Sequence, residues 1–260
     1  SVAAPRRKAP DGVTYRSVLK TTDGAYTNKT IDLSTNEISE VTIEPATEDE
    51  INATVKVMGG EDWRLWIDAM KEADVLSDNA VTVAYSYIGP VLTHPIYFDG
   101  SIGRAKADLY KTADEIDEQV DGVSAYVSVN KAVVTQSSAA IPIVPLYLSI
   151  LLKVMKEKNV HEECIQQMYR LVHDRLCNKS GVPVDDKRLI RMDDYEMESE
   201  IQQEVEKIWN GITPENLTEV ADIDEYWKEF YEIFGFKIDG VDYGADCDIQ
   251  VQIPSLDSAE

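Results

Sequence analysis

The chain has 260 residues, of which 43% are hydrophobic, so it can bury the core of a globular protein. Its 48 acidic and 25 basic side chains give a formal net charge of −23 at pH 7. This charge repels phosphate backbones and anionic lipid surfaces, which argues against a nucleic-acid partner and against membrane-surface binding. Any anionic ligand would need positive groups at its own site.

The first part of the chain predicts loops and short strands, followed by two helices. Residues 40–44 alternate apolar and polar side chains as a strand does. Thr47 and Glu50 have the spacing of a capping box, which predicts a helix through Val57. A second helix is predicted to bury one aromatic stripe, formed by Trp63, Trp66, Ile67 and Met70.

Two uncharged, β-branched runs at residues 80–85 and 125–129 predict interior strands covered on both faces. A helix is predicted to begin near Gly100, between these two runs. Strands that alternate with helices are typical of an α/β fold with a parallel sheet.

The second half of the chain predicts more helices. An apolar helix is expected at residues 145–158, and Asp193 with Asp194 is expected to cap an acidic helix through Trp209. A strand or hairpin is expected at residues 184–192, and an aromatic-rich helix at 224–234. A helix at residues 162–177 is expected to have a buried stripe of Ile165, Met168, Leu171, Val172 and Leu176.

Some classes of site and segment have no support in the sequence. The histidines and cysteines form no HExxH or CxxC pattern, so no metal site is predicted. The longest apolar stretch, residues 139–154, is interrupted by two prolines and a lysine, so no transmembrane segment is predicted.

The loop after residues 80–85 contains the strongest candidates for chemistry. It places Tyr87 and Tyr97 beyond the carboxyl end of a predicted strand, where open α/β sheets bind ligands, and Lys106 follows Tyr97 by nine residues. An ammonium beside a phenol is expected to lower the phenol's pKa, and the phenol can donate to a developing oxyanion. On spacing alone a chance pairing competes with this interpretation, because the chain has 13 tyrosines.

Longer strings give a resemblance to a known family. YSYIGPVLTHPIYFDGSIGRAK at residues 85–106 and VVTQSSAAIP at 133–142 resemble the trans-2-enoyl-CoA and enoyl-ACP reductases of the Tyr-x8-Lys type, and most of all their euglenoid-like branch. VKVMGGEDW, MDDYEME and FGFKIDGVDY, at residues 55–63, 192–198 and 234–243, look like landmarks of the same family. The resemblance extends over almost the whole chain.

The resemblance implies a fold and an activity. The expected fold is α/β, with a partial Rossmann-like (short-chain-reductase-like) parallel sheet and an added helical substrate-binding region. Residues 1–180 would form the catalytic domain and residues 181–260 a helical extension. The implied activity is the NADH-dependent reduction of a trans-2-enoyl-CoA or enoyl-ACP in lipid metabolism, with NADPH left open as the cofactor.

The resemblance also assigns roles to particular residues. It implies that Tyr97 is the proton donor and that Lys106 contacts the cofactor and assists the tyrosine. Tyr87 would touch the thioester end of the substrate. The other implied cofactor contacts are Val2, Ala3, Val133, Val134 and Thr135.

Two departures from the family pattern affect these expectations. Phe98-Asp99 stands where relatives usually carry Trp and a small or polar residue, and we expect Asp99 to face solvent. Residues 1–5 resemble the end of the family's fourth nucleotide-domain strand, and no GxGxxG occurs in the sequence. We therefore expect the carboxyl-terminal part of a reductase, with a further chain or segment that supplies the nucleotide-binding part.

Three interpretations of this chain stay open: a fragment, one half of a split enzyme, and a catalytically inactive accessory subunit of a larger assembly. The resemblance favours a mitochondrial location, with the cytoplasm as the alternative.

Overall fold

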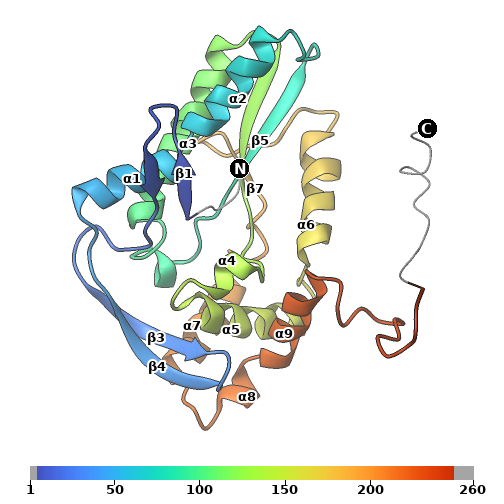
Figure 1. Ribbon diagram of the computed structural model, residues 1–260. Coiled ribbons are helices and arrows are strands. Elements are labelled where there is room, and N and C mark those ends of the chain that lie inside the picture. Colours follow the sequence, from blue (N-terminus) through green and yellow to red (C-terminus); the bar gives the residue numbers. More distant parts are fainter. Residues whose placement is uncertain (1–4, 249–260) are drawn as a thin grey trace.

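A three-stranded parallel sheet forms the centre of the computed structural model, which describes residues 5–248 (Figure 1). Its strands are β5 (Ala80–Ser86), β6 (Val123–Val129) and β7 (Leu189–Arg191), in that spatial order. Helix α3 (Ser101–Gln119) connects β5 to β6, which pairs with both neighbours in parallel. The predicted α/β class with a parallel sheet is therefore confirmed.

The strand predicted at residues 80–85 differs in its burial. In the described part of the chain β5 lies at an edge of this sheet, and Val81 and Tyr85 are about half exposed. The prediction of a strand covered on both faces is therefore wrong for β5 there, whereas β6, between its two neighbours, is mostly buried.

Two antiparallel hairpins precede the sheet. They are β1 (Arg6–Lys8) with β2 (Thr14–Arg16), and β3 (Tyr26–Asp32) with β4 (Glu37–Ile43), which contains the strand predicted at residues 40–44. The longer hairpin lies away from the sheet, beside the group of helices that includes α5 (Figure 1).

The next two helices are α1 (Glu48–Met58) and α2 (Glu61–Glu72), and the predicted capping box of Thr47 and Glu50 is present at the start of α1. Trp63 and Ile67 of α2 are buried, but Trp66 is 64% exposed, so the predicted stripe is wrong at Trp66. Successive helical residues are about 100° apart, which places Trp66 at the margin of the face that Trp63 and Ile67 share.

A hydrophobic core separate from the one that packs on the sheet surrounds α5 (Val144–Glu157), whose side chains are buried almost throughout. Helices α7 (Ser199–Gly211), α8 (Leu217–Val220) and α9 (Ile223–Glu232) contribute to this core, and α4 (Gln136–Ala139) contacts α5. The helices predicted at 145–158 and 224–234 are confirmed as α5 and α9. Figure 1 shows this group beyond the end of the sheet at which β6 leads into α4.

The helix predicted at residues 162–177 is interrupted. Helix α6 (Cys164–Arg170) continues as a π-helical turn at Leu171–Leu176. Bonds from i to i+5 change the 3.6-residue period on which the predicted stripe depends. Met168, Leu171 and Leu176 still pack into one cluster with Ile190 and Met192, so the stripe is confirmed at these three residues and wrong at Ile165 and Val172. Ile165 is 73% exposed and Val172 51% exposed, while Leu171 is buried.

The segment around β7 confirms one prediction and corrects another. A strand forms within residues 184–192 as predicted, and it belongs to the sheet although it lies in the range expected to be a helical extension. Asp193 and Asp194 do not cap α7, which begins at Ser199 after an N-cap at Glu198. Their carboxylates instead pair with arginines, among them Arg170, Arg175 and Arg191. The two-domain division stays a prediction.

Within residues 5–248 no helix is both long enough and apolar enough to cross a bilayer. The same residues hold no cluster of three or more histidine, cysteine or acidic side chains arranged for a metal ion.

Candidate active site

Two cavities, of about 530 Å³ and about 320 Å³, lie at the carboxyl end of β5. Both are lined by Tyr85, Tyr97, Lys106, Ser137 and Ile141. The tyrosine and the lysine that the sequence singled out therefore share one site, although they lie on different elements. The second cavity also reaches α5, which supplies part of its apolar wall.

A close backbone approach at Gly103 places Tyr97 and Lys106 at this site. The loop before α3 turns back on itself, so that the backbone N–H of Tyr97 donates to the carbonyl oxygen of Thr93 at 3.0 Å. A Cβ atom at Gly103 would overlap the carbonyl oxygen of Phe98. Because Gly103 has no side chain, the first turn of α3 can lie directly against this loop, and Lys106 follows about one turn later.

Tyr97 is half-buried, and its ring meets that of Tyr87 edge to face with centroids 5.0 Å apart. Burial raises the pKa of Tyr97 to about 12. The expectation that the Lys106 ammonium lowers this pKa is therefore wrong, because the shift comes from desolvation of the phenolate and, to a smaller extent, from Tyr110. Tyr97 is a neutral phenol at ordinary pH and can donate its proton.

Lys106 is held at the end of the sheet by one hydrogen bond. Its Nζ atom donates to the backbone carbonyl oxygen of Tyr85 at 3.1 Å. Burial lowers the pKa of Lys106 to about 8, because the ammonium loses hydration in the cavity wall. The side chain is thus a cation at neutral pH, and it can lose its charge within the range in which enzymes are assayed.

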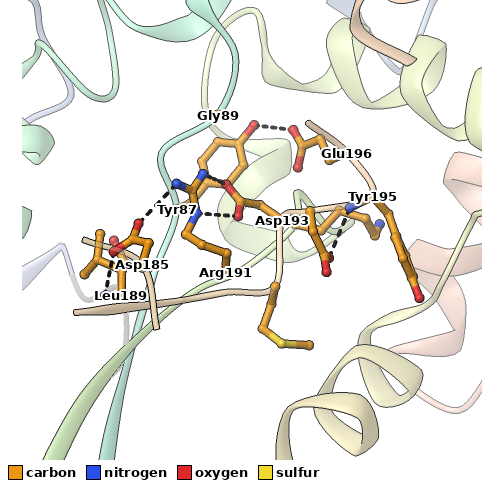
Figure 2. Close-up of polar contacts among 12 residues, drawn as sticks. Tyr87, Gly89, Asp185, Leu189, Arg191, Asp193, Tyr195 and Glu196 are labelled. Atoms are coloured by element: carbon orange, nitrogen blue, oxygen red, sulfur yellow. Dashed lines mark hydrogen bonds and ion pairs between the residues drawn. The ribbon is translucent and has the colours of Figure 1, made fainter. Parts of the chain in front are cut away.

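Tyr87 lines only the smaller of the two cavities. Its hydroxyl donates to Oε1 of Glu196 at 2.9 Å (Figure 2). Burial raises the pKa of Tyr87 well above its usual value, and the negative charge of Glu196 adds to the shift. Tyr87 is therefore a neutral side chain whose only hydroxyl proton is already in a hydrogen bond.

The predicted cofactor contacts divide into three groups. Val133 and Thr135 line the smaller cavity together with Tyr97 and Lys106. Val134 does not: it is 4% exposed and borders a separate cavity of about 210 Å³ beside α6 and α9. The structure thus brings two of these three residues to the candidate site. Val2 and Ala3 lie outside the described residues.

Asp99 is exposed, as expected, and it does not line either of the two cavities that contain Tyr97. Its backbone N–H donates to the carbonyl oxygen of His94 at 2.8 Å, which helps to close the loop. Asp99 instead borders a separate cavity of about 340 Å³, which Tyr87 and Lys106 also line.

Two charged residues at the site were missed by the sequence analysis. Lys131 and Glu196 are 3% and 0% exposed, and both lie just beyond the carboxyl end of a strand, Lys131 after β6 and Glu196 after β7. Burial lowers the pKa of Lys131, an effect that the negative charge of Glu196 opposes. Their positions after two strands of a parallel sheet were the signal that could have identified them.

The fold and the site define an α/β protein with a tyrosine–lysine pair in a cavity at the carboxyl end of a parallel sheet. A protein-family model described as the trans-2-enoyl-CoA reductase catalytic region matches residues 1–177. The chain therefore belongs to the trans-2-enoyl-CoA reductase family, as its sequence strings predicted.

Curated relatives support the same assignment. The chain is 54% identical over 259 residues to trans-2-enoyl-CoA reductase [NADH] of Ruminiclostridium cellulolyticum, an alignment that covers 98% of this chain and 65% of the relative. It is 50% identical over 260 residues to enoyl-[acyl-carrier-protein] reductase [NADH] of Coxiella burnetii, covering 98% of this chain and 64% of the relative. The chain thus spans about two thirds of the length of these relatives.

Solved structures of the family have the same fold. The trans-2-enoyl-CoA reductase of Clostridium acetobutulicum in complex with NADH superposes with a TM-score of 0.90 at 48% identity, covering 95% of this chain and 63% of that one. The enzyme of Treponema denticola in complex with NAD gives a TM-score of 0.91 at 44% identity, covering 95% and 62%. The α/β fold with its parallel sheet is thus shared with the superposed part of these reductases.

A second family model, described as an enoyl reductase FAD binding domain, matches residues 184–247. The two arginines of this range, Arg188 and Arg191, are each held by two aspartates. Neither offers an unpaired guanidinium for a pyrophosphate, so this range does not fit a flavin dinucleotide through its arginines, and no step below involves one.

Proposed function

We propose that this protein takes part in the NADH-dependent reduction of a trans-2-enoyl thioester to the saturated acyl thioester. The observation that carries the proposal is the presence of Tyr97 and Lys106 in the wall of the same two cavities. A neutral phenol and a cation in one cavity provide a proton donor and a group that attracts an anionic cofactor. Relatives named as NADH-dependent reductases support this choice of chemistry.

NADH, when bound, supplies the hydride that adds to C3 of the conjugated thioester. The electron pair of the double bond then moves toward the carbonyl oxygen, and protonation at C2 completes the saturated acyl chain. In our proposal the hydroxyl of Tyr97 donates its proton to this oxygen, where negative charge develops. The resulting enol then takes a proton from water at C2 and releases its O–H proton, which restores the phenol. A donor aimed at developing charge in a largely dehydrated site lowers the barrier more than it stabilises the substrate.

The charges at the site meet the requirement set by a net charge of −23. Lys106 and Lys131 both line the smaller cavity, together with Val133 and Thr135. We propose that these residues hold the nicotinamide end of the cofactor and that Lys106 also supports Tyr97. Tyr87 is proposed to contact the thioester end of the substrate.

The pyrophosphate of the cofactor needs further groups. The printed sequence has no GxGxxG turn, which in Rossmann-like folds binds the pyrophosphate at a helix N-terminus. We propose that a further segment or chain supplies this part of the site. The alternative, an inactive accessory subunit, is less well supported, because a purely structural role has no need of this tyrosine–lysine pair beside two cavities.

The proposal is tested by following NADH oxidation with crotonyl-CoA and, in a parallel experiment, with a crotonyl-carrier protein. The full-length protein is expected to oxidise NADH only when an enoyl thioester is present and to form the saturated thioester in equal amount. NADPH serves as the competing cofactor. Absence of turnover with both thioesters and both cofactors would support the accessory-subunit alternative.

A further inference from the structure

A buried carboxylate joins the proposed substrate contact to the proposed cofactor loop. Glu196 is 0% exposed, and its Oε1 atom accepts hydrogen bonds from the hydroxyls of Tyr87 at 2.9 Å and Tyr147 at 2.6 Å. Its Oε2 atom accepts from the backbone N–H of Ala132 at 2.6 Å. Figure 2 shows the hydroxyl of Tyr87 pointing at this carboxylate.

The segment that carries Glu196 is bound to the sheet before this residue and to α7 after it. The backbone N–H groups of Met192 and Asp193 donate to the carbonyl oxygen of Val129, the last residue of β6. The guanidinium of Arg191 donates two hydrogen bonds, of 2.8 and 2.6 Å, to the carboxylate of Asp193 (Figure 2). Gln202 of α7 donates to the backbone carbonyl oxygen of Glu196 at 2.7 Å.

The position of Tyr87 is equally restricted. Its ring lies against that of Tyr97, and a Cβ atom at Gly89 would come within 2.7 Å of its hydroxyl. Gly89 has a φ of +75°, which side-chain-bearing residues rarely adopt. The ring therefore has little room to turn, and its hydroxyl keeps its direction toward Glu196.

From these contacts we infer that Glu196 is a positioning residue: it binds the single hydroxyl proton of Tyr87 and holds the Ala132 backbone, so that Tyr97, and not Tyr87, donates to the thioester. A phenol has one O–H donor, and the donor of Tyr87 is already used. Tyr85, Tyr87 and Tyr97 all line the smaller cavity, and the hydroxyl of Tyr87 is the one that Glu196 binds, whereas that of Tyr97 is not held by Glu196. The inference rests on the proposed reduction.

Replacing Glu196 by glutamine tests whether residue 196 must accept the hydroxyl proton of Tyr87. A glutamine of nearly the same shape can accept from Ala132 N–H through its oxygen only if its amide nitrogen faces the two tyrosines. That nitrogen is a donor, so the hydroxyl of Tyr87 would have to accept instead, and its proton would be released toward the cavity. The Ala132 contact would survive in Glu196→Gln and be lost in Glu196→Ala.

The experiment is a double-mutant cycle with Glu196→Gln and Tyr87→Phe in the full-length protein, assayed with crotonyl-CoA and NADH. Glu196→Gln is expected to lower kcat/KM for crotonyl-CoA about ten-fold and to change KM for NADH less than about two-fold. In the Tyr87→Phe background the same substitution is expected to cost less than about two-fold. Glu196→Ala should also raise KM for NADH.

The matched control is Glu200→Gln, which changes a carboxylate of α7 whose side chain is 83% exposed and should leave both constants unchanged. Losses that multiply in the double variant would overturn the inference, and so would a Glu196→Gln protein with wild-type constants. The affinity of each variant for crotonyl-CoA, measured by calorimetry, gives the same double-mutant comparison from binding alone. Wild-type protein that binds crotonyl-CoA but does not reduce it would contradict the proposed function alone; protein that does neither would overturn both.

Discussion

The Nζ atom of Lys106 lies 3.1 Å from the backbone carbonyl oxygen of Tyr85, the penultimate residue of β5. This contact ties the first turns of α3 to the end of the strand that precedes it, across the loop that contains Tyr97. One hydrogen bond thus keeps a cation at the carboxyl edge of the sheet. Its strength depends on the charge of the lysine, which makes the site sensitive to pH.

Activity is expected to fall as the pH rises through about 8, because burial lowers the pKa of Lys106 to about 8 and the neutral amine attracts the anionic cofactor less. The measurement is kcat/KM for NADH against pH, which reports ionisations of the free enzyme. The decrease in kcat should occur at higher pH than the decrease in kcat/KM, because the bound anionic cofactor stabilises the ammonium form of Lys106. A flat profile between pH 7 and about 9 would contradict this prediction.

Lys106→Arg keeps the positive charge at position 106 but removes its loss near pH 8. A guanidinium stays protonated above pH 12, so the decrease near pH 8 should disappear in this variant, whatever its absolute rate. Lys106→Met should lower kcat/KM for NADH at every pH below about 8 and remove the same limb. Retention of the wild-type limb in both variants would show that another group titrates.

Gly103→Ala is expected to lower kcat/KM about ten-fold or more and to destabilise the fold, because its Cβ atom would overlap the carbonyl oxygen of Phe98 and push the Tyr97 loop away from α3. Gly211→Ala, at the last residue of α7, is the matched control, since a Cβ atom there meets nothing within 4 Å. The control should keep full activity. Equal activity of the two variants would contradict the role given to Gly103.

Thr47→Ala is expected to lower the free energy of unfolding by about 1 kcal/mol, because it removes the hydroxyl that accepts from the backbone N–H of Glu50 at the start of α1. Thr47→Ser keeps this hydroxyl and should unfold near the wild-type urea concentration. Kinetic constants should not change in either variant. An alanine variant as stable as the serine variant would show that the capping box contributes little here.

Local patterns predicted the parts of the fold that depend on local chemistry. The capping box of α1, the positions of strands β5 and β6, and the meeting of Tyr97 with Lys106 all depend on residues close together in the chain. The two-domain division and the mitochondrial location stay predictions.

The features that were missed depend on residues far apart in the chain. Asp193 looks like a helix cap in sequence, but Arg191 binds it and α7 begins six residues later. Glu196 looks like a solvated acid until the fold brings it to Tyr87, which is 109 residues away. Buried charges require partners, and such partners are found only when the chain has folded.

The most direct test of the whole account is the turnover of crotonyl-CoA by Tyr97→Phe in the full-length protein, with Tyr169→Phe as the control because Tyr169 is 67% exposed. Loss of the proton donor is expected to reduce kcat by about 10²- to 10⁴-fold, while NADH affinity and thermal stability stay close to those of the wild type. The control should keep wild-type turnover. A Tyr97→Phe protein that reduces crotonyl-CoA at the wild-type rate would contradict the assignment of Tyr97 as the donor.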